Sequence, residues 1–81
     1  MKTDKKQISL PYLEDEQTGI IITITGRRNA SKRLADLGLT PGTEIKVVNR
    51  TLFSGPVQIE VCGSKLVLGR GLASKILIVL K

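Results

Sequence analysis

The sequence RLADLGLTPG, residues 33–42, encodes one short amphipathic helix together with the signal that ends it. Ala30, Leu34 and Leu37 lie about one helical turn apart, so we expect them on one face of this helix. Asn29 directly precedes them, and its short side chain can accept a hydrogen bond from a free backbone N–H group of the first turn. The sequence therefore predicts a helix that is capped at Asn29 and ends at Leu37.

Glycine and proline set the end of this helix. Gly38 is expected to adopt the left-handed conformation that ends a helix, because it has no Cβ atom. Leu39 would then lie where a Schellman motif places an apolar contact back onto Leu34. Pro41, which precedes Gly42, cannot donate a backbone hydrogen bond and prevents the helix from resuming. The chain after Gly42 is predicted to form strands.

Length and composition indicate one small domain. The chain has 81 residues, of which 41% are hydrophobic, and this fraction excludes a disordered chain. We expect residues 1–7 to be a frayed segment and residues 8–81 to form the domain. Tyr12 and Phe53 are the only aromatic residues, so the core must consist of isoleucine, leucine and valine. Cys62 is alone, and there is no signal peptide or membrane-length apolar run, which favours a cytoplasmic location.

Alternating apolar residues predict short antiparallel strands. Val57, Ile59 and Val61 alternate with polar residues or cysteine, a pattern typical of a half-buried strand. The dipeptide Gly63-Ser64 is expected to form a two-residue hairpin turn. Five strands are predicted in total, over residues 20–25, 43–50, 57–62, 65–68 and 75–80.

Strands of this length leave exposed edges unless the sheet curls into a barrel. The predicted fold class is therefore mainly β, a small SH3-like barrel of about five strands with one short helix after the first strand. We expect an extended lead-in and a single turn over residues 8–13, a polar turn closing on Gly19, and a short turn over residues 69–74. Any strand edge that stays open would allow self-association.

Residues that usually perform catalysis or bind metals are scarce. The chain has no histidine, and its one cysteine lacks a histidine partner, so neither a zinc site nor a Cys–His nucleophile is expected. The acidic residues 14–16 are adjacent, and their side chains diverge too much to complete a cation shell. Gly69, Gly71 and Ser74 approach a dinucleotide-binding motif but lack the long helix that it requires. We therefore expect no enzyme, no cofactor and no metal site.

Positive charge is concentrated around the helix. The net charge is +6, and the densest cluster consists of Arg27, Arg28, Lys32 and Arg33. Such a cluster favours an acidic partner surface, nucleic acid or anionic lipid and does not decide among them, and a solvated helix face is the simpler alternative. Nucleic-acid binding is not expected, because two aromatic residues are too few to stack bases, although phosphate contacts alone stay open.

Two apolar residues in a loop, Leu52 and Phe53, are further candidates for partner contact. Apolar side chains of this size can anchor an interface when they enter a pocket of the partner. The alternative is that they cap the end of the barrel. Both possibilities stay open at the level of the sequence.

Four sequence blocks resemble the ferrous-iron transport protein A (FeoA) family. They are RLxxLGLxPGT at residues 33–43, GPV at 55–57, GSKLxLGR at 63–70 and AxxI at 73–76. The resemblance extends over residues 8–80, and the first block is its most specific part. It implies an SH3-like β-barrel with structural roles for the motif residues Leu34, Leu37, Gly38, Leu39, Pro41, Gly42, Gly55, Pro56, Gly71 and Ala73.

The resemblance also implies a small cytoplasmic accessory protein of bacterial ferrous-iron uptake. Its expected partner is ferrous-iron transport protein B, a membrane permease with a cytosolic GTP-binding domain, so the membrane is reached only through the partner. We expect Arg27, Arg28, Lys32 and Arg33 to face an acidic surface of that domain. The alternative functions are a nucleic-acid-binding basic barrel and a stand-alone relative of the SH3-like domain of metal-dependent repressors.

Overall fold

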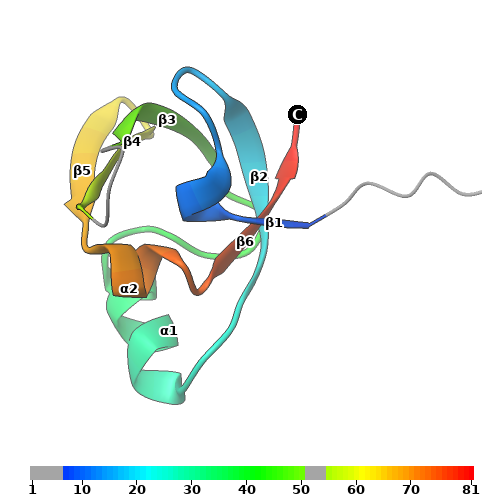
Figure 1. Ribbon diagram of the computed structural model, residues 1–81. Helices are drawn as coiled ribbons and strands as arrows, with labels where there is room; N and C mark the ends of the chain where they lie inside the picture. Colours follow the sequence, from blue (N-terminus) through cyan, green and yellow to red (C-terminus); the bar gives the residue numbers. More distant parts are fainter. Residues whose placement is uncertain (1–6, 51–54) are drawn as a thin grey trace, which may run out of the picture.

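Antiparallel strands form one curled sheet in the order β1-β6-β2-β3-β4-β5 (Figure 1). The structure is a computed structural model that describes residues 7–50 and 55–81. Its strands are β1 (Ile8–Ser9), β2 (Thr18–Ile24), β3 (Glu44–Arg50), β4 (Val57–Val61), β5 (Ser64–Leu68) and β6 (Ile76–Leu80). Its helices are the 3-10 helix η1 (Leu10–Tyr12), α1 (Arg28–Asp36) and α2 (Arg70–Ala73).

The predicted fold class, a small and mainly β SH3-like barrel, is confirmed, but the described chain has one strand more than expected. The additional strand is β1, in which Ile8 pairs with Ile78 and Ser9 pairs with Leu77. Two residues are too few to produce an alternating pattern, so the sequence indicates only an extended lead-in there. As a consequence, α1 follows the second strand rather than the first.

The segment between β5 and β6 is a one-turn helix, α2, where the sequence predicts a turn. The N–H groups of Ala73 and Ser74 donate to the carbonyl oxygens of Gly69 and Arg70, each at 2.9 Å. Gly71 lies in this helix outside the left-handed region, and an added Cβ would meet nothing within 4 Å. The structural role expected for Gly71 therefore has no basis in the geometry, whereas Ala73 is fully buried.

The core is aliphatic, as the composition predicts. In the described part of the chain no polar or charged side chain is buried. Tyr12 is 70% exposed, because η1 turns it outward while Leu10 and Leu13 point inward. The hydrophobic core cluster consists of Leu10, Leu13, Ile21, Leu34, Leu39, Ile45, Val47, Val57, Ile59, Val61, Leu68, Ala73, Ile76 and Ile78.

Helix α1 begins two residues earlier than predicted. The N–H groups of Ala30 and Ser31 both donate to the carbonyl oxygen of Arg27, at 3.1 and 3.3 Å, so Arg27 is the N-cap residue. Gly26, with φ +99°, turns the chain immediately before it. Asn29 consequently lies inside the first turn, and the expected side-chain cap is absent.

A Schellman motif ends α1. The N–H of Leu39 donates to the carbonyl oxygen of Leu34 and the N–H of Gly38 to that of Ala35, both at 2.9 Å. Gly38 has the positive φ, +86°, that this motif requires. Leu34 and Leu39 are fully buried, but Leu37, expected on the buried face, is 43% exposed. The chain leaves the helix at Leu37, so Leu39 takes the place in the core that the helical spacing assigns to Leu37.

The hairpin between β4 and β5 turns one residue earlier than predicted. Val61 pairs with Ser64, which makes Cys62 and Gly63 the two turn residues. Both have positive φ, +51° and +79°, as a type I′ turn demands. Cys62 is therefore an exposed turn residue rather than a residue on a strand surface.

Gly19 lies inside β2. The sequence predicts that Gly19 closes the preceding polar turn, and this prediction is wrong. A Cβ at this position would overlap Cγ2 of Ile78 and lie 2.9 Å from the carbonyl oxygen of Val79. The glycine therefore allows β6 to pack closely against β2. Further along β2 the pairing register shifts between Ile21 and Thr23, and Ile22 is 40% exposed.

Candidate partner-binding surface

Helix α1 carries the four basic residues that the sequence singles out, and all four are exposed. Arg27 caps the helix, Arg28 is its first residue, and Lys32 and Arg33 follow about one turn later. The structure thus brings together Arg27, Arg28, Lys32 and Arg33, which we call the basic surface. In Figure 1 α1 lies at the lower end of the molecule, away from the loop between η1 and β2.

The basic surface is exposed because α1 packs against the core through one face only. Leu34 is its only buried residue, and the Schellman motif ties Leu34 to Leu39 just beyond the helix. The remaining faces of α1 contain charged or small residues and point to solvent. One apolar anchor and a fixed helix end are therefore enough to present the basic residues on a rigid element.

The charges of the basic surface have no acidic partner among the described residues. Ion pairs join Lys46 to Glu16 and Lys81 to Glu44, both at 3.0 Å, and both lie outside α1. The first turn of α1 contains no acidic residue, and two arginines lie at its N-terminus. Cations are unfavourable at this end because the helix dipole is positive there. Positive potential is therefore concentrated at one end of the molecule.

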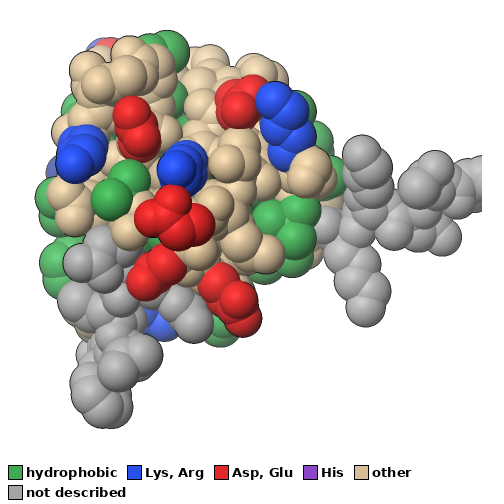
Figure 2. Space-filling view, turned by 90° about the horizontal axis from the view of Figure 1, so that it is seen from above, with side chains coloured by type: hydrophobic (Ala, Val, Ile, Leu, Met, Phe, Trp, Pro, Cys, Tyr) green, Lys and Arg blue, Asp and Glu red, His purple; other side chains and the backbone are tan. Residues whose placement is uncertain are grey.

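The opposite end of the molecule has a different electrostatic character. Figure 2, which views the molecule from above, shows several Asp and Glu side chains on that face, with Lys and Arg side chains among them. The loop between η1 and β2, at the top of Figure 1, contributes residues 14–16, all acidic and all exposed. This end of the molecule therefore carries charges of both signs, whereas α1 carries mainly positive charge, an arrangement that is not evident from the net charge.

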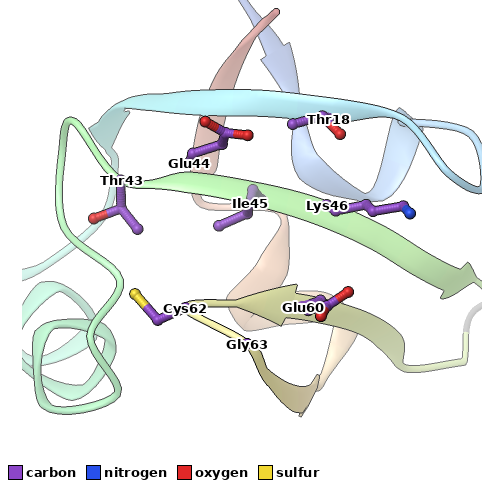
Figure 3. A pocket seen from close by; sticks show the side chains of 8 residues that line it. All are labelled: Thr18, Thr43, Glu44, Ile45, Lys46, Glu60, Cys62 and Gly63. Atoms are coloured by element: carbon purple, nitrogen blue, oxygen red, sulfur yellow. The ribbon is translucent and has the colours of Figure 1, made fainter.

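An open hollow of about 590 Å³ lies between β2, β3 and the hairpin of β4 and β5. In Figure 3 Lys46 and Glu60 lie across from each other on β3 and β4, and Thr43 and Cys62 line the other end. The pKa of Lys46 is raised by its hydrogen bond to Glu16, by the charge of that carboxylate and, less, by Glu60. The residues that line the hollow are Thr18, Thr43, Glu44, Ile45, Lys46, Glu60, Cys62 and Gly63.

Sequence reasoning did not identify this hollow. Its walls come from segments up to 45 residues apart in the chain, and only the strand register places Lys46 beside Glu60. The outward alternation of Glu44 and Lys46 on β3 was the one available signal. In the hollow Glu44 and Lys46 are engaged in ion pairs and Glu60 lies across from Lys46, so no positive charge is left unpaired there as it is on α1.

The other candidate residues lie apart from the basic surface or outside the described chain. Leu52 and Phe53 fall outside the described residues. Gly55 and Pro56 directly precede β4. Pro41 and Gly42 form the turn before β3, where Gly42 has φ +96°.

Metal-binding side chains do not cluster in residues 7–50 and 55–81. No group of three or more His, Cys, Asp or Glu residues in these ranges could hold a metal ion. In the acidic loop Glu16 pairs with Lys46, and the side chain of Gln17 accepts a hydrogen bond from the N–H of Glu14 at 2.8 Å. In the same ranges, no helix has both the length and the apolar character needed to cross a bilayer.

The chain is similar in sequence and in structure to known proteins. The FeoA domain model matches residues 8–80. The putative Fe(2+) transport protein A of Methanocaldococcus jannaschii is 33% identical over 69 residues, which cover 85% of this chain and 82% of that protein. The crystal structure of an iron uptake regulatory protein (FeoA) superimposes with a TM-score of 0.87 at 32% identity, covering 94% of this chain and all of that one.

The fold also occurs inside a larger protein. A manganese-dependent transcriptional repressor superimposes with a TM-score of 0.88 at 20% identity. The match covers 98% of this chain but 44% of the repressor. At this identity the similarity shows a common fold, and fold alone does not establish function.

Proposed function

The chain belongs to the FeoA family, and on that premise we propose that it is a cytoplasmic accessory protein of ferrous-iron uptake that binds the cytosolic GTP-binding domain of a ferrous-iron permease. The observation that carries the proposal is the basic surface on α1. Its four cations are exposed, lie on one rigid helix and have no acidic partner among the described residues. A surface of this kind matches an acidic face of another protein.

The proposed contribution of this surface is to guide association. Complementary charges steer two proteins into contact and raise the association rate more than they raise the final affinity. Arg27 and Arg28 lie at the positive end of the helix dipole, so their potential and that of the free N–H groups add. Exposed apolar area at Leu37, the C-cap residue of the helix, would supply contact that charge alone does not.

The mode of action that we propose is binding, not catalysis or metal transfer. The chain contains no histidine and a single cysteine. The acidic loop at residues 14–16 could contact iron only through its carboxylates, and Glu16 already binds Lys46. The geometry therefore supports a role in which the barrel docks onto the transporter and iron does not pass through it.

The test is binding of the purified cytosolic domain of the permease, measured by surface plasmon resonance at low and high salt. We expect Arg28→Glu combined with Arg33→Glu to lower the association rate constant about tenfold at low salt, because it reverses two charges of the steering surface. The matched control is Lys65→Glu combined with Lys81→Glu, on β5 and after β6, which changes the net charge equally but away from α1. Equal effects of the two double variants, or no effect of the first, would contradict the proposed surface.

Nucleic-acid binding is the alternative that the same charges allow. Tyr12, the only aromatic residue in the described ranges, is exposed on η1 and not on α1, so it is not placed to stack bases beside the basic surface. A salt-sensitive mobility shift with DNA or RNA, abolished by the Arg28 and Arg33 changes, would favour this alternative over a protein partner.

A further inference from the structure

Strand β5 forms an open edge of the sheet. In the strand order it has β4 as its one neighbour, and Figure 1 shows it at the outer left of the molecule. The other edge, β1, has only two residues and runs directly into η1, which contains Pro11. β5 has five residues and no proline, and the register shifts of the sheet lie elsewhere, in β2 and β3. Of the two edges, β5 is the longer one, and it lacks the proline and the register shift that often protect an edge, with Lys65 as its one charged residue.

The backbone groups on this edge can be assigned from the hairpin. Val61 and Ser64 flank a two-residue turn and therefore form a hydrogen-bonded pair. Along an antiparallel strand, residues alternate between pointing their N–H and C=O groups toward the neighbour and away from it. Lys65 and Val67 consequently direct these groups to the open side, and neither has a backbone hydrogen bond to a described residue there.

The side chains of the edge are mostly apolar. Val67 is 64% exposed, and Leu66, on the core side, is only partly buried. Lys65 is the single charged residue of β5. An exposed valine on an open strand is the kind of surface that another strand covers.

We propose that β5 is the contact between two copies of this chain, which pair antiparallel about a two-fold axis through Leu66. This inference is independent of the function proposed above. In this register Lys65 of each copy lies opposite Val67 of the other, and the two pairs exchange four N–H···O=C hydrogen bonds. The alkyl stem of Lys65 then covers Val67, and no lysine faces a lysine. A second copy fits this edge because Lys65, the only charged residue of β5, does not lie opposite Lys65 of the other copy.

Opposite charges introduced at position 67 test this pairing. Val67→Glu would place a carboxylate opposite Lys65 of the second copy, whereas Val67→Lys would place a like charge there. Within its own chain Val67 pairs with Gln58, which is neutral, so neither variant meets a like charge directly across on β4. The two variants should therefore be folded alike and differ in self-association.

The measurement is sedimentation equilibrium over a wide range of protein concentration at low salt, with thermal melting as the check on folding. We expect Val67→Glu to tighten the dimer and Val67→Lys to weaken it, each roughly fivefold in dissociation constant, from two cross-strand charge pairs per dimer. Tyr12→Glu and Tyr12→Lys, at an exposed residue outside β5, should leave the dissociation constant unchanged. A wild-type chain that stays monomeric, or two Val67 variants that shift the equilibrium in the same direction, would overturn the proposal.

Discussion

Truncation of Leu34 should destabilise the protein far more than the same truncation at Leu37, three residues later at the C-cap of α1. Leu34 is fully buried and is the only residue of the helix in the core, whereas Leu37 is 43% exposed. Replacing a buried leucine by alanine costs about 2–5 kcal/mol, because a cavity remains where the side chain was. A domain of 81 residues has a free energy of unfolding of roughly 4–12 kcal/mol. Leu34→Ala should therefore remove a large fraction of the stability.

Leu37→Ala is the matched control, since it removes the same atoms from the residue that caps the same helix. Half of that surface already contacts water and no cavity forms, so we expect a loss below about 1 kcal/mol. Urea unfolding followed by circular dichroism measures both variants. With a slope of about 1 kcal/mol/M, Leu34→Ala should lower the midpoint by about 2 M or more. Equal losses for the two variants would show that the helix is not anchored as described.

Further predictions concern two glycines and one ion pair. Gly38→Ala should lower the free energy of unfolding by about 1 kcal/mol, because φ is +86° at this position. Gly71→Ala should leave it unchanged or raise it by up to about 1 kcal/mol, because position 71 is helical and has open space around it. Urea unfolding of the two variants measures both effects. The Glu16 carboxylate raises the pKa of Lys46. The stability that this ion pair contributes is therefore present at neutral pH and is lost as the pH rises through the raised pKa of Lys46. NMR titration of Lys46 should give a lower pKa in Glu16→Gln, and an unchanged pKa would contradict the ion pair.

The two proposals use different parts of the molecule. The basic surface lies on α1, and the proposed self-association uses the edge of β5. Binding of the permease domain can therefore fail while the dimer persists, and the reverse also holds. Charge changes at Arg28 and Val67 separate the two contacts experimentally.

The basic surface was predictable because its residues are close in the sequence. Arg28, Lys32 and Arg33 occupy one short helix, and helical spacing brings such residues together whatever the rest of the fold does. The hollow beside β3 was not predictable, because Thr18, Lys46 and Glu60 meet only through strand pairing. Pairing partners far apart in the chain leave no local pattern.

Local chemistry in the chain was sufficient to specify the end of α1 and the alternation of β4. Gly38 ends the helix because it alone tolerates the positive φ at low cost, and Val57, Ile59 and Val61 face inward because strand geometry has a period of two. The burial of Leu39 in place of Leu37, the pairing of β1 with β6 and the open edge at β5 required the assembled sheet. These features depend on which distant segments lie side by side, and the free energy that selects them comes from non-local packing.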